Sequence, residues 1–335
     1  MSVIRVSSLL RHILLSAAVA AIPFGANAQE KHYRFAYDQP TTTGYGVVGD
    51  IFANKMKELS KGQFLVDQYP GAQLGQEPQV LQLLKSGDID FAISSSANAA
   101  TVSPQAGVMS LHFLFRSEDH LTKAIADPRV SDAVKAMIEE TVQGSHVIGL
   151  ATLGLRSMYS KKEIHKVEDI KGLKVRVQAT PTEDAIFPAY GAQVVHMPFG
   201  SVYTSLQTGV VDVAENGINV YLVNKHYEVA PVLSLTEHEA NNSLVWISDK
   251  LWSSLTAEQK QWVQAAADEV SKEMPDKAFG LEHDSMAKLE KMGVKFVKGV
   301  DKSGFIKDAE PLQDQLAEKL GPGAVNVLQL VRAVK

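Results

Sequence analysis

The chain has 335 residues, a formal net charge of −5 and no cysteine. The absence of cysteine excludes a disulfide-stabilised scaffold and thiolate chemistry, and a mildly acidic chain is a poor candidate for nucleic-acid binding. A chain of this length can bury large hydrophobic cores and is expected to form two domains.

The N-terminal 28 residues are predicted to be a secretory signal peptide. Basic residues precede an apolar run at 13–24 that is too short to span a bilayer, and Ala26-Asn27-Ala28 fits an A-x-A cleavage site. Cleavage would remove 28 of the 335 residues, leaving 307 that begin at Gln29, and the loss of two arginines would change the formal charge from −5 to −7. No later segment is apolar for long enough to cross a membrane. We therefore expect a bacterial periplasmic protein.

Apolar and amphipathic segments alternate along the rest of the chain. Strands are predicted at 33–37 and 64–69, with a helix between them at 46–61. Further strand–helix units follow, with apolar strands at 193–196 and 232–236. Such alternation is typical of an α/β fold in which helices cover both faces of the sheets.

The segment Gly44-Tyr45-Gly46-Val47-Val48-Gly49 opens the first predicted helix and matches the GxGxxG pattern of dinucleotide-binding sites. Six residues that include Pro40 separate this segment from the preceding strand, whereas the dinucleotide fingerprint needs a tight turn there. An exported protein would also be separated from the NAD pool. We therefore interpret the segment as a glycine-rich loop at the rim of a cleft.

One helix–glycine–strand segment occurs twice, at Leu84–Ser95 (LKSGDIDFAISS) and Leu206–Gly217 (LQTGVVDVAENG). In each copy the glycine stands where a helix ends in a left-handed residue, and a short buried strand follows. Each predicted strand ends in polar residues, at 94–96 and at 215–216. Because open α/β sheets bind ligands beyond the carboxyl ends of their strands, both ends are expected to face one cleft. The alternative is that so short a similarity arises by chance.

Arg176 is the strongest single candidate for ligand binding. In the segment KGLKVRVQATP, at 171–181, alternation places the apolar residues on one face of a strand and Arg176 on the other. A lone buried guanidinium costs several kcal/mol, so Arg176 needs a partner. That partner is either an internal carboxylate or the carboxylate of a ligand, held by two parallel hydrogen bonds. The strand pattern favours neither alternative.

Two short clusters combine histidine with acidic residues. Glu237-His238-Glu239 could bind a metal, but consecutive side chains of an extended segment point to opposite faces, so a cleft-lining or solvated loop is favoured. Glu282-His283-Asp284 falls within a predicted long helix and is expected on its solvated face. Signatures of serine hydrolases, zinc proteases and Ser-x-x-Lys enzymes are missing from the sequence. We predict neither a metal site nor a cofactor.

A nearly continuous helical pattern runs from Ala257 to about Met292. Thr256 and Gln259 fit a capping box at its start. A helix of about 35 residues would be roughly 50 Å long, more than one small domain requires. We predict that it braces two lobes and is kinked at Pro275. The alternative is a pair of helices broken at Pro275.

Several stretches distributed over most of the chain resemble, in their order and spacing, those of a known protein family. They are YPGAQLGQE (69–77), FLFRSEDH (113–120), DIKGLKVRVQ (169–178), MPFGSVYTSLQTGVVDVAEN (197–216) and KHYEVAPVLSLTEH (225–238). In them the chain resembles the DctP-like solute-binding proteins of TRAP (tripartite ATP-independent periplasmic) transporters.

The resemblance implies two α/β lobes joined by hinge strands, with a long helix spanning both lobes, that close around a ligand. It implies that Arg176 forms a bidentate salt bridge with the substrate's carboxylate and that Arg156 assists. Asn216 matches the asparagine after the family's D-x-A-E run. The implied partners are a small organic acid and the small and large membrane subunits of a TRAP transporter, and we expect a monomer. The expected lobes are 29–152 plus 242–280, and 153–241 plus 281–335.

The sequence also departs from the family's usual pattern at four positions. Gln178 stands where proline is frequent, and Ala179 where a polar residue often reaches the ligand. Val213 replaces a usual glycine, and Gly217 stands where a second asparagine is common. These departures leave Arg176 intact, but the identity of the substrate cannot be carried over from the family.

We predict a receptor that captures an organic acid, favouring a sugar acid such as a hexuronate or aldonate. A sugar acid needs one cationic anchor and many groups for its hydroxyls, and polar residues at predicted strand ends and loops offer these. They are Asp38, Gln39, Ser94, Ser95, Asn98, Asn216, Asn219, Glu237, Asn241 and Asn242. We expect about half of them to be loop caps or hinge residues instead.

Three alternatives remain beside the sugar-acid receptor. The first is a receptor for a C4-dicarboxylate or 2-keto acid, in which Arg156 binds the second carboxylate or the keto oxygen. The second is a periplasmic enzyme acting on a small acid, and the third is a chemosensing receptor without a transporter.

Overall fold

The computed structural model describes residues 30–335, so the predicted signal peptide and its cleavage site lie outside the described residues. Nine strands form one sheet in the order β2-β1-β3-β8-β4-β7-β5-β6, and β9 pairs with β8. The strands are β1 (Lys31–Ala36), β2 (Phe64–Tyr69), β3 (Phe91–Ser95), β4 (Ser145–Ser160), β5 (Lys174–Val177), β6 (Gln193–His196), β7 (Val213–Gly217), β8 (Val232–Ser248) and β9 (Lys295–Val297).

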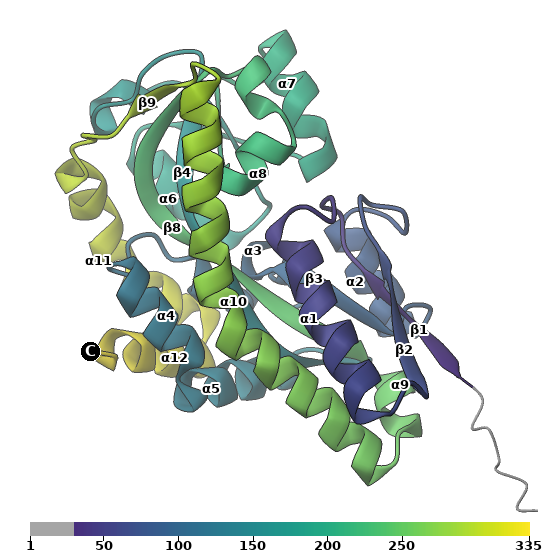
Figure 1. The fold of residues 1–335 in the computed structure, drawn as a ribbon. Helices are drawn as coiled ribbons and strands as arrows, with labels where there is room; N and C mark the ends of the chain where they lie inside the picture. The colour runs from purple at the N-terminus through teal and green to yellow at the C-terminus, as the bar shows by residue number, and fades with distance from the viewer. Residues whose placement is uncertain (1–29) are drawn as a thin grey trace, which may run out of the picture.

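Twelve α-helices among the described residues surround this sheet (Figure 1). They are α1 (Gly44–Leu59), α2 (Glu77–Ser86), α3 (Ser96–Ala99), α4 (Glu118–Ala126), α5 (Pro128–Glu139), α6 (Pro181–Ala189), α7 (Val202–Thr208), α8 (Ile218–Val223), α9 (Asp249–Ser254), α10 (Ala257–Lys291), α11 (Ser303–Leu320) and α12 (Pro322–Ala333). The predicted two-lobed α/β class is confirmed. None of these helices combines the length and apolarity needed to cross a bilayer.

The two halves of the molecule share the long antiparallel strands β4 and β8. At one end β8 also pairs with β3, which continues to β1 and β2, and at the other end β4 pairs with β7. The sheets of the two lobes are therefore joined into one. Within the β4–β8 ladder, Thr152 lies opposite Asn242, so two of the expected lobe boundaries face each other. The lobe boundaries stay a prediction. Helix α12 of the second expected lobe packs against α5 of the first.

Both copies of the helix–glycine–strand segment have the predicted geometry. Gly87 after α2 and Gly209 after α7 each have φ 75°, the left-handed conformation that ends a helix, and β3 and β7 follow. Ser95 at the end of β3 pairs with Ser243, while Gly217 at the end of β7 pairs with Arg156, itself opposite Glu239. Positions 239 and 243 are about 13 Å apart along a regular strand. The two strand ends thus meet near the middle of β8.

Helix α10 is continuous through Pro275, so the alternative of two separate helices is wrong. The capping box is confirmed: the Gln259 amide donates to Thr256 Oγ1 at 3.2 Å, and the Thr256 amide donates to Gln259 Oε1 at 3.0 Å. The helix packs against α1 and β4 and, farther along, against α8. Figure 1 shows that it changes direction part-way along its length, as expected for a helix with an internal proline.

The GxGxxG segment is not a loop, and that prediction is wrong. Helix α1 begins at Gly44, so the glycines lie in its first turns. A Cβ atom on Gly46 would lie 1.9 Å from the Thr41 carbonyl oxygen, and one on Gly49 would lie 2.1 Å from Gln68 Oε1. These glycines let α1 pack closely against the preceding loop and β2, and this packing places Tyr45 at the ligand pocket.

Candidate ligand-binding site

A pocket lies where the two strand ends meet, and residues from both halves of the molecule line it. The lining residues are Gln39, Tyr45, Glu77, Ser95, Asn98, Leu153, Arg156, Arg176, Gln178, Phe199, Asn216, Val220 and Asn241. The pocket therefore brings together seven of the residues predicted to bind a ligand. They are Arg176, Arg156, Asn216, Asn98, Gln39, Ser95 and Asn241.

Arg176 on β5 is buried but has no acidic partner. Its Nε and one terminal nitrogen donate to the Met197 carbonyl oxygen at 3.2 and 3.0 Å. Among residues 30–335, no carboxylate lies within salt-bridge distance of its guanidinium, and burial lowers its pKa. The internal ion pair that the sequence allowed is thus not formed. A buried guanidinium with only a carbonyl partner can bind a ligand carboxylate by donating hydrogen bonds to it.

Arg156 on β4 is the opposite case, because internal carboxylates already surround it. It forms a bidentate pair with Glu215, and Glu239 Oε2 lies 3.1 Å from its Nε. Burial opposes its charge, but Glu215 and Glu239 outweigh burial and raise its pKa. One terminal nitrogen also donates to Asn241 Oδ1 at 3.2 Å. Arg156 lines the pocket, but its positive charge is balanced within the protein.

Polar side chains fill the space between the two arginines. Asn216 Oδ1 accepts from Asn241 Nδ2 at 3.1 Å and from the Gly217 amide at 2.9 Å. Gln178, at a position where the family often has proline, accepts from Arg156 at 3.4 Å through Oε1. These contacts hold the amides in fixed orientations at the pocket wall. Such preorganised amides can bind the hydroxyl groups of a ligand.

The other half of the pocket carries negative charge. Glu77, at the start of α2, is buried and accepts hydrogen bonds from Tyr45, Ser95 and Asn98. Burial and the neighbouring Glu77 raise the pKa of the Asp38 carboxyl well above its usual range. The pocket lining therefore combines an available cation from one half of the molecule with fixed acceptors from the other half.

Sequence reasoning had not singled out Glu77. It closes the family-like stretch at 69–77, and this was the available signal. However, an acidic residue in the first turn of a helix is commonly explained by the helix dipole alone, so its position did not mark it as a ligand-binding residue.

Residues 18–320 match the model of the DctP family, described as "bacterial extracellular solute-binding protein, family 7". The chain belongs to this family. The predicted membership of the DctP-like family is thus confirmed, and the family is extracytoplasmic, in agreement with the expected periplasmic location.

Solved and curated proteins agree with this assignment. The chain is similar to a TRAP periplasmic solute-binding protein from Xanthobacter autotrophicus Py2 solved with bound β-D-galacturonate (30% identity, TM-score 0.84, covering 90% of this chain and 100% of the other). It is also similar to one from Pseudomonas putida F1 with bound D-glucuronate (28% identity, TM-score 0.83, covering 91% and 98%). The 2,3-diketo-L-gulonate-binding periplasmic protein YiaO of Escherichia coli K12 is 28% identical over 324 residues, covering 96% of this chain and 97% of its own.

Other predicted binding residues of this family 7 protein lie outside the pocket lining. Ser94 accepts from Trp246 Nε1 at 2.9 Å inside the sheet, and Asn219 donates to Ser285 on α10 at 3.2 Å. Asp38 lies behind Gln39, whose Nε2 donates to it at 3.2 Å. Contacts within the protein thus engage all three side chains.

Glu237 also lies away from the pocket. Its side chain is 42% exposed, and it pairs with Lys302 beside a separate surface cavity that includes Phe113 and Leu155. Because Glu237 has φ 45° within a bulge of β8, its side chain is directed differently from those of its neighbours.

The predictions for the two histidine–acid clusters need correction. His238 and Glu239 are buried in β8, so the expected cleft-lining or solvated loop is wrong. Glu282 is buried on α10, where it accepts from the amides of Leu155 and Ile218 at 3.4 and 3.2 Å, so its expected solvated position is wrong too. Burial raises the pKa of Glu282 to about 8. Backbone polar groups near the hinge, which need partners, explain why this acid is turned inward.

Proposed function

We propose that the chain is the periplasmic receptor of a TRAP transporter for a sugar acid, a hexuronate or an aldonate. The arrangement that carries this proposal is a buried Arg176 without an acidic partner, in a pocket that Glu77 of the other half of the molecule also lines. Arg176 would bind the carboxylate, and Glu77 would accept from a hydroxyl. Closure of the two halves would remove this ion pair from water and so strengthen it.

The charge distribution favours a polyhydroxylated monocarboxylate over a C4-dicarboxylate. A second carboxylate would need a second available cation, but Glu215 and Glu239 balance Arg156. A second carboxylate in this pocket would also be repelled by the carboxylate of Glu77. Hydroxyl groups can donate to that carboxylate in charge-assisted hydrogen bonds. The galacturonate, glucuronate and 2,3-diketogulonate in the descriptions of similar proteins support the same ligand class.

We further propose that the protein acts by binding alone, as a monomer that delivers its ligand to the small and large membrane subunits. Its relatives are described as binding proteins, which supports this role over an enzymatic one. Recovery of unchanged ligand from a stoichiometric complex is the expected result. Product formation would instead support the enzyme alternative.

Calorimetric titration tests the ligand class. The protein would be titrated separately with glucuronate, galacturonate, gluconate, succinate and pyruvate under identical conditions. We expect binding of at least one of the three sugar acids with one site per chain. Binding of succinate or pyruvate only would refute the sugar-acid assignment while leaving the receptor role intact. Uptake by vesicles that contain the membrane subunits, with and without the receptor, separates transport from chemosensing.

A further inference from the structure

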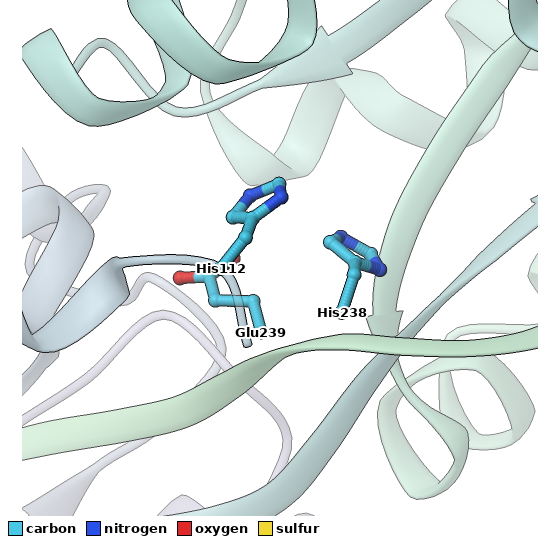
Figure 2. Close-up of side chains that lie close together, drawn as sticks. All are labelled: His112, His238 and Glu239. Atoms are coloured by element: carbon cyan, nitrogen blue, oxygen red, sulfur yellow. The ribbon is translucent and has the colours of Figure 1, made fainter. Parts of the chain in front are cut away.

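A second cluster of ligand-type atoms lies beside Arg156, outside the pocket lining. It consists of His112, His238 and Glu239, which are all buried and each offer one donor atom within 4.8 Å of the others. In Figure 2 the side chains of His238 and Glu239 rise from the same side of strand β8, and His112 approaches from a neighbouring segment. No hydrogen bond links these three side chains to one another.

The bulge in β8 explains how consecutive residues come to share one side. Arg156 pairs with Glu239, but Met158 pairs with Ser234, so β8 has extra residues opposite β4 here. The left-handed φ of Glu237 turns the backbone within this bulge. His112 is held nearby because the amide of Phe113 donates to the His238 carbonyl oxygen at 2.7 Å. The regular alternation that argued against a metal site therefore does not apply.

Both imidazoles are oriented as metal ligands usually are. His112 Nδ1 lies 2.9 Å from the Tyr190 hydroxyl, and His238 Nδ1 lies 2.8 Å from Thr236 Oγ1. Their Nε2 atoms are buried and have no hydrogen-bond partner among the described residues. A ring held by a hydrogen bond at one nitrogen, with the other nitrogen unpartnered, is typical of metal-binding histidines.

Two buried carboxylates adjoin these nitrogens. Glu239 Oε2 makes no hydrogen bond within the described part of the chain, although Arg156 Nε lies 3.1 Å away. Glu183, in the first turn of α6, has no hydrogen-bond partner at either oxygen among residues 30–335, and its Oε2 lies 3.5 Å from His112 Nε2. Leaving buried carboxylate oxygens without hydrogen bonds is costly, so the two Glu183 oxygens indicate a missing partner, and Glu239 Oε2 has room for one beside Arg156.

The local charge is consistent with a divalent cation. Glu183, Glu215 and Glu239 in their ionised forms carry three negative charges, against the one positive charge of Arg156. An ion of charge +2 would neutralise the remainder. Two imidazole nitrogens and two carboxylate oxygens form a donor set that suits zinc and related transition metals, whereas calcium and magnesium prefer oxygen ligands alone.

We propose that His112, His238, Glu239 and Glu183 bind one divalent transition-metal ion of the zinc class. Tetrahedral donors at about 2.1 Å from zinc are about 3.4 Å apart. Glu183 Oε2 and His112 Nε2 already have this spacing at 3.5 Å, and the ion would draw His112, His238 and Glu239 together by up to about 1.4 Å from their separations of up to 4.8 Å. It would connect the loop at 111–115 and helix α6 to the hinge strand β8. The competing explanation is a protonated Glu183 that donates to His112 Nε2 without any metal.

Metal titration of the chelator-treated protein tests the proposal. We expect about one Zn²⁺ per chain with a dissociation constant below about 1 µM, counted by mass spectrometry and calorimetry. Co²⁺ in the same site should give the visible absorption of a four-coordinate ion. Single substitutions His112→Gln, His238→Gln and Glu239→Gln should each weaken Zn²⁺ binding by at least about 100-fold. The matched control is His283→Gln, because His283 is an exposed histidine on α10.

Wild-type protein provides a readout that does not depend on the folding of the variants. Zn²⁺ should shift the ring-nitrogen NMR signals of two histidines, those that the site variants lack, and leave the His283 signal unchanged. The proposal is overturned if the wild-type protein binds no stoichiometric metal, or if His112→Gln and His238→Gln bind Zn²⁺ as the wild type does. Unchanged ring-nitrogen signals would favour the protonated Glu183.

Discussion

The surroundings of Arg176 and of Arg156 differ sharply, although both arginines are buried in the same pocket wall. Arg176 contacts one carbonyl oxygen, whereas Arg156 contacts the carboxylates of Glu215 and Glu239. A buried charge that lacks an internal counter-charge destabilises the protein until a ligand supplies one, and a buried charge that has one belongs to the framework. The partners of each arginine, rather than its residue type or burial, thus distinguish a ligand anchor from a structural ion pair.

The largest expected effect is on stability, from replacing Arg156. Arg156→Met would leave Glu215 and Glu239 buried without their cation, and we expect a loss of about 3–5 kcal/mol in the free energy of unfolding. Urea denaturation monitored by circular dichroism measures it. The matched variant Arg176→Met should unfold at the same or a higher urea concentration, because it removes an unpaired charge. Equal losses of unfolding free energy in the two variants would contradict the distinction between a structural Arg156 and a ligand-binding Arg176.

The next effect is on binding, from replacing Arg176. Arg176→Met should weaken sugar-acid binding by at least about 100-fold, since the carboxylate loses both charge-assisted hydrogen bonds. Arg176→Lys should also bind poorly, because an ammonium group cannot reproduce the planar fork of the guanidinium. Calorimetry with glucuronate or galacturonate decides this, with circular dichroism as the check on folding. Near wild-type affinity in either variant would assign Arg176 a structural role.

Glu282 extends the comparison to a buried acid without a cation. Burial raises its pKa from 4.5 to about 8, with smaller contributions from Glu118 and Glu237. The folded state therefore binds a proton that the unfolded state releases between about pH 4.5 and pH 8, and the stability contributed by this group is lost as pH rises through that window. Glu282→Gln removes the titration and keeps an acceptor for the two backbone amides.

We expect Glu282→Gln to gain stability relative to the wild type on raising the pH from 5.5 to 8, on the order of 2 kcal/mol. Urea midpoints of both proteins at the two pH values measure the difference. The exposed Glu58→Gln should track the wild type at both values. A constant offset between Glu282→Gln and the wild type would show that Glu282 is ionised throughout.

The smallest effect is expected on binding, from replacing Glu77. Glu77→Gln should weaken sugar-acid binding by roughly 10-fold, because a neutral amide accepts from a ligand hydroxyl less strongly than a carboxylate. Calorimetric titration with glucuronate measures it, again with Glu58→Gln as the matched control. Tighter binding of succinate to Glu77→Gln would further show that Glu77 excludes a second carboxylate. Unchanged affinity of Glu77→Gln for every sugar acid would show that the ligand's hydroxyl groups do not contact Glu77.

Local rules predicted much of the fold. The strands at 64–69 and 193–196 have the observed bounds, and the capped helix beginning at Ala257 does too, because periodicity and capping act over a few residues. The strand predicted at 232–236 continues to Ser248, since the polar residues within it obscured the pattern. Among these residues Asn241 lines the pocket, Glu239 contacts Arg156, and Glu237 lies in the bulge.

The candidate site was less accessible to sequence reasoning. The alternation of apolar and polar residues indicated Arg176 as a ligand-binding candidate. Whether its partner is an internal carboxylate or a ligand depends on which acids lie nearby in the fold. Glu215 is 59 residues from Arg156 in the sequence, and no local rule pairs them. The bulge that buries His238 and Glu239 on one side likewise arises from the register between β4 and β8. Long-range pairing, which propensity and periodicity do not contain, decides these contacts.

The shared strand β8 also bears on how the nascent chain folds. Its pairing partners β3 and β4 precede it, and Thr152 must wait for Asn242, roughly 90 residues later, before their ladder forms. Neither half of the sheet is complete until then. A chain that stalls before β8 should therefore be digested readily by protease, and release of the last hundred residues should confer resistance on both halves together.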